Sequence, residues 1–74
     1  MRERCIKSIK KAEELLERVA TLPLTKREKE IVEKAKHYLD DAKYFLSKED
    51  FFTSFGASDY AYGLLEALLF LKGF

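Results

Sequence analysis

The chain has 74 residues, and its 14 basic and 13 acidic side chains leave a net charge of +1. Hydrophobic residues make up 47% of it, which excludes a disordered chain, and the balanced charge argues against a dominant role in nucleic-acid or membrane-surface binding. The single cysteine, Cys5, excludes an intrachain disulfide, so stability must come from helix packing and oligomerisation.

Residues 2–21 are predicted to form the first helix. Apolar side chains, among them Cys5, Ile9 and Leu15, recur at helical spacing and make one narrow stripe. The other sides are charged, so this helix should lie on the outside with Cys5 in the core. Pro23 then ends the helix, because proline lacks an N–H donor and disfavours helix at the residue before it.

The first helix also carries a basic side that could bind a phosphate backbone. Acidic residues follow it at once, and no glycine-rich or aromatic platform for single strands accompanies it. A solvated helix face is the simpler interpretation, and nucleic-acid binding is kept as an alternative. The residues concerned are Arg4, Lys7, Lys11 and Arg18.

A second helix is predicted over residues 26–46. Thr25 and Glu28 fit a capping box, in which the two side chains accept hydrogen bonds from free backbone N–H groups. The polar turn from Ser47 to Asp50 is short, so the next helix should return antiparallel to this one.

The third helix, predicted over residues 50–72, is apolar nearly all round. Only Asp59, Glu66 and Lys72 are charged between Phe51 and Phe74, whereas a surface helix normally keeps a charged face. We therefore expect it to be covered from more than one side. Gly56 and Gly63 each cost about 1 kcal/mol relative to alanine inside a helix. That cost suggests the close approach of another helix backbone.

These elements predict an all-α, antiparallel three-helix bundle that forms a single domain over residues 1–74. The third helix is central, and its surplus aromatic side chains indicate association, with homodimerisation as the leading hypothesis and another protein partner as the alternative. The candidate interface residues are Phe51, Phe55, Tyr62, Gly63, Leu69 and Phe70.

Tyrosines and carboxylates at helical spacing on the second and third helices could form a small polar pocket. The simpler interpretation is that tyrosine hydroxyls find carboxylate partners at the edge of the core. The candidate pocket residues are Tyr38, Asp41, Asp59, Tyr60 and Glu66.

A metal or small-ligand site near His37, Asp41 and Glu66 is a further alternative, because His37 and Asp41 share a helical face. The chain has one histidine and lacks the repeated Glu-x-x-His motifs of di-iron bundles. We therefore predict no metal, no cofactor and no catalytic residue, and expect the protein not to be an enzyme. We also expect a cytoplasmic location without membrane insertion, because the N-terminus lacks a signal-peptide core and no apolar run is long enough.

Two stretches are familiar: YLDDAKYFL at 38–46 and YAYGLLEA at 60–67, with Asp50 and Phe55 between them. They resemble an archaeal family of small helical proteins of unknown function, number 357 in its series. The resemblance covers about residues 38–67, and the second stretch is the more specific. It implies an archaeal source and a compact three-helix bundle, and it implies no known activity.

Overall fold

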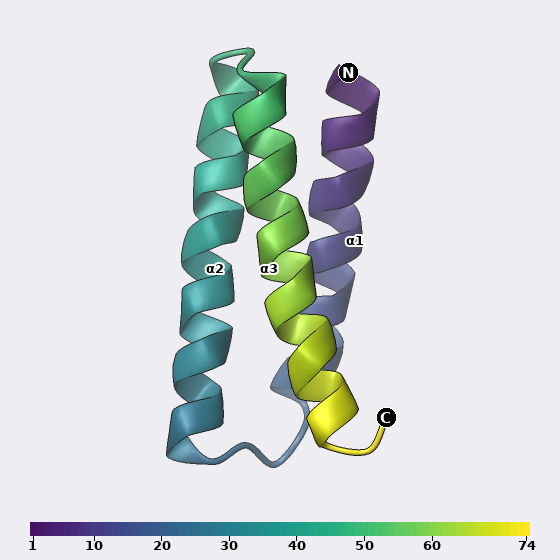
Figure 1. Cartoon of the computed structure of the whole chain (residues 1–74), viewed down its shortest axis with the longest axis vertical. Coiled ribbons are helices and arrows are strands. Elements are labelled where there is room, and N and C mark those ends of the chain that lie inside the picture. Colours follow the sequence, from purple (N-terminus) through teal and green to yellow (C-terminus); the bar gives the residue numbers. More distant parts are fainter.

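Three helices form an antiparallel bundle. The computed structural model describes residues 1–74 and contains α1 (Arg2–Ala20), α2 (Lys26–Ser47) and α3 (Phe51–Leu71). The helices run the length of a molecule that measures 36 × 19 × 15 Å, and α3 packs against both α1 and α2 (Figure 1). The predicted all-α three-helix bundle is confirmed, and each helix end lies within one residue of the expected bound.

Local hydrogen bonds determine where α2 and α3 begin. The Thr25 N–H donates to Glu28 Oε1 at 2.8 Å, and the Glu28 N–H donates to Thr25 Oγ1 at 3.2 Å. This pair is the predicted capping box, and it satisfies two backbone donors at the start of α2. At α3, Asp50 Oδ1 accepts a hydrogen bond from the Thr53 N–H at 3.2 Å. Glu49 in the turn between them has φ 62°, a left-handed conformation that few non-glycine residues adopt.

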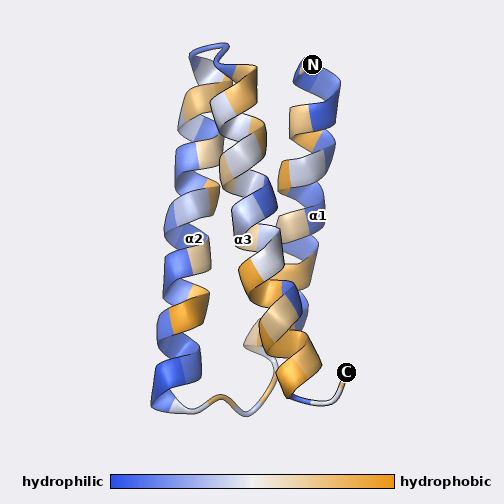
Figure 2. Ribbon diagram, in the orientation of Figure 1, coloured by the Kyte–Doolittle hydropathy of each residue, from blue (hydrophilic) through white to orange (hydrophobic).

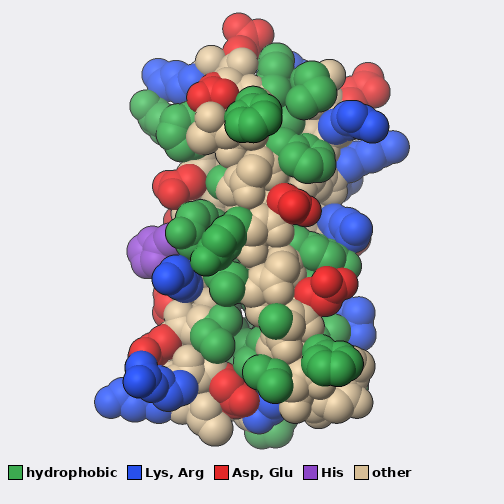
Figure 3. Space-filling view, in the orientation of Figure 1, with side chains coloured by type: hydrophobic (Ala, Val, Ile, Leu, Met, Phe, Trp, Pro, Cys, Tyr) green, Lys and Arg blue, Asp and Glu red, His purple; other side chains and the backbone are tan.

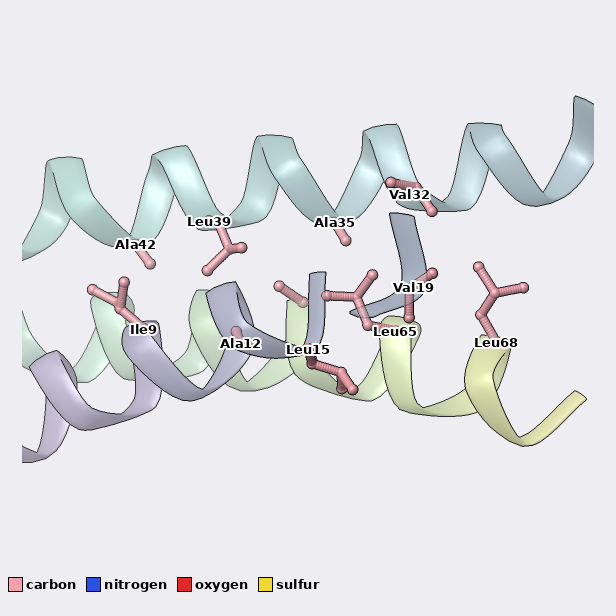
Figure 4. Close-up of a cluster of buried hydrophobic side chains, with 11 residues drawn as sticks. Ile9, Ala12, Leu15, Val19, Val32, Ala35, Leu39, Ala42, Leu65 and Leu68 are labelled. Atoms are coloured by element: carbon pink, nitrogen blue, oxygen red, sulfur yellow. The ribbon is translucent and has the colours of Figure 1, made fainter. Parts of the chain in front are cut away.

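The hydrophobic core lies along the line where the three helices meet (Figure 4). Each helix contributes side chains that are almost fully buried, and burying one leucine or valine stabilises the fold by about 1.5–3 kcal/mol. The cluster consists of Ile9, Ala12, Leu15, Val19, Val32, Ala35, Leu39, Ala42, Ala61, Leu65 and Leu68.

Small side chains face inward from the first half of α3. Ser54, Ser58 and Ala61 are completely buried there. The Ser54 hydroxyl donates to the Ala42 carbonyl oxygen at 2.7 Å, and the Ser8 and Ser58 hydroxyls share a hydrogen bond of 2.6 Å. Because the inward side chains are short and their hydroxyls have partners, α3 can lie close to both neighbouring helices.

The second half of α3 is strongly hydrophobic on the side that Figure 2 presents to the viewer. We expected α3 to be covered from more than one side, and α1 and α2 do cover two of its flanks. Its remaining side carries exposed residues along the whole helix. No helix, α3 included, is both long enough and apolar enough to cross a membrane.

Candidate functional site

The side of α3 that faces away from α1 and α2 is apolar at both ends. Phe52 near its start is 86% exposed, and Phe70 near its end is 79% exposed. In Figure 3, hydrophobic side chains gather at both ends of the molecule and on either side of a strip of backbone and other atoms that runs down its middle, with acidic side chains beside the strip. We call this surface the outer face of α3. It comprises Phe52, Gly56, Asp59, Gly63, Glu66, Ala67, Phe70 and Leu71, all of them exposed.

The inward small residues explain how the outer face arises. Once Ser54, Ser58 and Ala61 point into the bundle, positions 52, 56, 63 and 70 must lie on the opposite side, because a helix turns about 100° per residue. The bulky aromatic side chains at positions 52 and 70 therefore face solvent.

Gly56 and Gly63 occupy the middle of the outer face. A Cβ atom added to either glycine would meet nothing within 4 Å. The close helix approach that we expected at these glycines is therefore not made by α1 or α2. Packing inside the chain gives no reason for two glycines that each cost about 1 kcal/mol relative to alanine.

Most of the predicted interface row faces α1 instead of solvent. The Phe51 ring lies 5.3 Å from the Arg2 guanidinium carbon, and the Tyr62 ring lies 4.5 Å from Lys11 Nζ. Leu69 packs against the core. Of the six candidates, Gly63 and Phe70 lie on the outer face, while Phe55 is part of a groove beside α1. Phe52 also lies on the outer face but was not among the predicted interface residues. Its position four residues before Gly56 places the two on one side of the helix, so the sequence held a signal for it.

Three of the five polar-pocket candidates come together. Tyr38, Asp41 and Tyr60 line a shallow groove of about 370 Å³ between α2 and α3, which Phe52 and Gly56 also border. The two tyrosine rings lie 4.5 Å apart at 33°. Asp59 and Glu66 lie elsewhere, because both are exposed on the outer side of α3, where Asp59 also borders a groove beside α1. The groove has one carboxylate and an aromatic lining, which fits tyrosine packing better than an acidic pocket.

The basic side of α1 opens onto a second groove, between α1 and α3, of about 240 Å³. We call it the α1–α3 groove. Three of the four predicted nucleic-acid candidates line it, and aromatic side chains of α3 form its other wall. Its lining is Arg4, Lys7, Ser8, Lys11, Phe55, Asp59 and Tyr62. The fourth candidate, Arg18, lies in an adjoining hollow with Glu14 and Glu17.

Two ion pairs hold separate parts of the bundle together and have a structural role. At one end of the bundle, Lys72 Nζ lies 2.9 Å from Glu28 Oε1. The backbone hydrogen bond from Thr25, with that from Lys72, lowers the pKa of Glu28 from its ordinary 4.5. Lys43 Nζ lies 2.6 Å from Glu13 Oε2, and this hydrogen bond raises the pKa of the ammonium group above 10.5.

The three residues of the alternative metal or small-ligand site lie on different surfaces of the bundle. His37 lies among lysines on the exposed side of α2, Asp41 lies in the tyrosine groove, and Glu66 lies on the outer face of α3. No group of three or more His, Cys, Asp or Glu side chains is close enough to hold a metal ion. The spacing of His37 and Asp41 on one helix was therefore misleading. Cys5 is fully buried, as expected, and its thiol donates to the Phe51 carbonyl oxygen at 3.3 Å.

Comparison with known proteins assigns the family. A family model described as "Protein of unknown function (DUF357)" matches residues 7–74. The chain belongs to the DUF357 family. The family resemblance suggested by residues 38–67 is thereby confirmed. No curated protein and no solved structure gives a match.

The DUF357 match includes both candidate surfaces. It begins at residue 7, so it covers the whole of α3 and most of the α1–α3 groove, with Arg4 and Cys5 just outside it. The match assigns no activity to either surface, and any function must be argued from their chemistry.

Proposed function

We propose that this protein is a non-enzymatic association module that forms a homodimer through the outer face of α3. The observation that carries the proposal is the exposure of large apolar side chains at both ends of that face, Phe52 at 86% and Phe70 at 79%. Exposed apolar patches larger than a few hundred Å² are uncommon on soluble monomers and often mark a surface that a partner covers.

The exposed apolar side chains of the outer face supply a large part of the area that a dimer needs. A fully exposed aromatic side chain presents about 150–250 Å². The exposed parts of Phe52, Phe70 and Leu71 thus present on the order of 400–500 Å² in total. A stable interface buries about 800 Å² on each partner, so these three side chains supply about half of one.

The pattern of the face favours a second copy as the occupant. In an antiparallel pair with its two-fold axis level with Ala61, Phe52 of one chain meets Phe70 of the other, because both are nine residues along the helix from that level. Aromatic ends then meet aromatic ends. The glycines lie near the crossing, where short side chains allow two helix backbones to approach.

The exposed carboxylates allow an experiment to distinguish homodimerisation from the binding of a basic partner protein. Asp59 and Glu66 form no ion pair within the chain, and both lie near the proposed two-fold axis. In a homodimer, like charges would oppose each other there. The double variant Asp59→Asn/Glu66→Gln should therefore associate more tightly with itself, whereas binding to a basic partner would weaken.

Sedimentation equilibrium of outer-face variants tests the proposal. Phe70→Ser removes a ring from both sides of a symmetric interface, at about 1.5–3 kcal/mol for each ring. We expect the dimer dissociation constant to rise about 100-fold or more. Tyr44→Ser is a matched control, because Tyr44 is 57% exposed on α2, away from the outer face. Equal effects of the two variants, or a monomeric unmodified chain, would contradict the proposal.

A cytoplasmic location and an archaeal source remain parts of this proposal. The single cysteine is free and buried, which suits a reducing compartment.

A further inference from the structure

The α1–α3 groove carries cations that form no ion pair within the chain. Arg4, Lys7 and Lys11 recur at intervals of three and four residues, so they lie on one side of α1. None of them forms an ion pair. Arg2, on the same helix, pairs with Glu49 at 3.2 Å, which shows that carboxylate partners are within reach of this end of α1. Because no carboxylate pairs with them, the three groove cations can contact an external anion, Lys11 while it also contacts the Tyr62 ring.

Two aromatic side chains form the opposite wall. Phe55 is 39% exposed, and Tyr62 is half-buried with its ring 4.5 Å from Lys11 Nζ. They are seven residues apart, which separates them by about 10 Å along α3. The rings and the cations were predicted separately from the sequence, and the packing of α1 against α3 places them in one groove.

We propose that the α1–α3 groove binds single-stranded nucleic acid. Phosphates contact Arg4, Lys7 and Lys11, and a base stacks on Phe55. The combination of a cationic track with an exposed ring is the physical basis of sequence-tolerant single-strand binding. A duplex fits less well, because its bases are already stacked and cannot reach the ring.

The size and charge of the groove set the expected strength of binding. Its volume of about 240 Å³ is too small to enclose a drug-sized ligand, but a strand can lie across a shallow groove. Asp59 is the one acidic side chain in the lining, and its carboxylate can accept a hydrogen bond from a base N–H group such as N3–H of uracil. With three phosphate contacts, binding should be weak and strongly dependent on salt.

Fluorescence anisotropy with a labelled oligouridine of about ten nucleotides, a length typical of small single-strand sites, tests the inference. The unmodified protein should bind at low salt. The logarithm of its association constant should fall against the logarithm of salt with a slope of about −2, as expected for three contacts with a single strand. A duplex of the same length should bind several-fold more weakly. The absence of binding at the lowest salt, or equal binding of the duplex, would overturn the inference.

A pair of charge reversals locates the site. Lys7→Glu/Lys11→Glu should weaken binding at least tenfold. Lys26→Glu/Lys29→Glu changes the net charge equally on an exposed part of α2 whose surface has no Phe, Tyr or Trp side chain, and it should have an effect of about threefold or less. Equal losses of affinity in the two variants would show that net charge alone attracts the oligonucleotide. That result would overturn the assignment of binding to the α1–α3 groove.

The stacking contact has a separate test. Phe55→Ala should weaken binding about tenfold, because one stacked base is lost, and it should leave the salt slope unchanged. Circular dichroism melting of each variant shows whether the bundle is intact. If folded Phe55→Ala binds as well as the unmodified protein, the aromatic part of the inference is wrong.

Discussion

Replacing the two outer-face glycines by alanine should have opposite effects on folding and on association. In Gly56→Ala/Gly63→Ala each new methyl group projects into open space, because an added Cβ meets nothing within 4 Å. Neither glycine has a positive φ, so alanine fits the existing backbone. The chain itself therefore offers no steric objection to either substitution.

The expected gain in stability follows from helix propensity. Alanine is favoured over glycine inside a helix by about 0.5–1 kcal/mol per site. The two sites are about 10 Å apart along the axis, so their effects should add. A total of about 1–2 kcal/mol corresponds to a rise in Tm of about 4–16 °C for a domain of this size. In the proposed dimer the same methyl groups hold the crossing helices apart, so the dissociation constant should rise.

Two assays separate the effects. Thermal unfolding followed by circular dichroism, at a concentration below the dissociation constant, reports on the single chain alone. Sedimentation equilibrium at higher concentration reports on association, with Gly63→Leu as a larger obstruction at the same position. A double variant that is no more stable than the unmodified chain would refute the reasoning about folding. A more stable variant that associates equally well would show that no helix crosses at the glycines.

Two further predictions concern the bundle itself. Leu65 is fully buried, so Leu65→Ala should lower the free energy of unfolding by about 2–5 kcal/mol in urea titration, and a loss below about 1 kcal/mol would show that its environment is loosely packed. The lowered pKa of Glu28 means that its contribution to stability is present above its ordinary pKa of 4.5 and is lost as pH falls through the lower, folded value. As pH falls below 4.5, stability should therefore fall more steeply in the unmodified chain than in Glu28→Gln, and identical pH profiles would show that the contacts of Glu28 with Thr25 and Lys72 do not contribute.

Local features of the fold could be predicted from the sequence. The helix ends follow from Pro23, the Thr25–Glu28 capping box and the polar turn that ends at Asp50, all of which act within a few residues. The core positions of α1 follow from an apolar stripe on an otherwise charged helix. Each of these signals depends on neighbours along the chain, which the sequence shows directly.

The orientation of α3 could not be predicted in the same way. Its apolar residues surround the helix, so hydrophobicity does not mark a buried side. The buried side is instead marked by Ser54 and Ser58, whose hydroxyls become acceptable in the core only once they have partners on other helices. The aromatic row at Phe51 and Tyr62 was therefore expected at an interface, although packing turns it toward α1. The α1–α3 groove was missed for the same reason.

The central claim is that a second copy covers the outer face of α3. Its most direct test is the molar mass of the unmodified chain in solution, measured by light scattering over a concentration series. The account predicts that the mass rises from the 8.7 kDa of one chain to twice that value as concentration increases. A mass that stays at 8.7 kDa up to the highest concentration would contradict it.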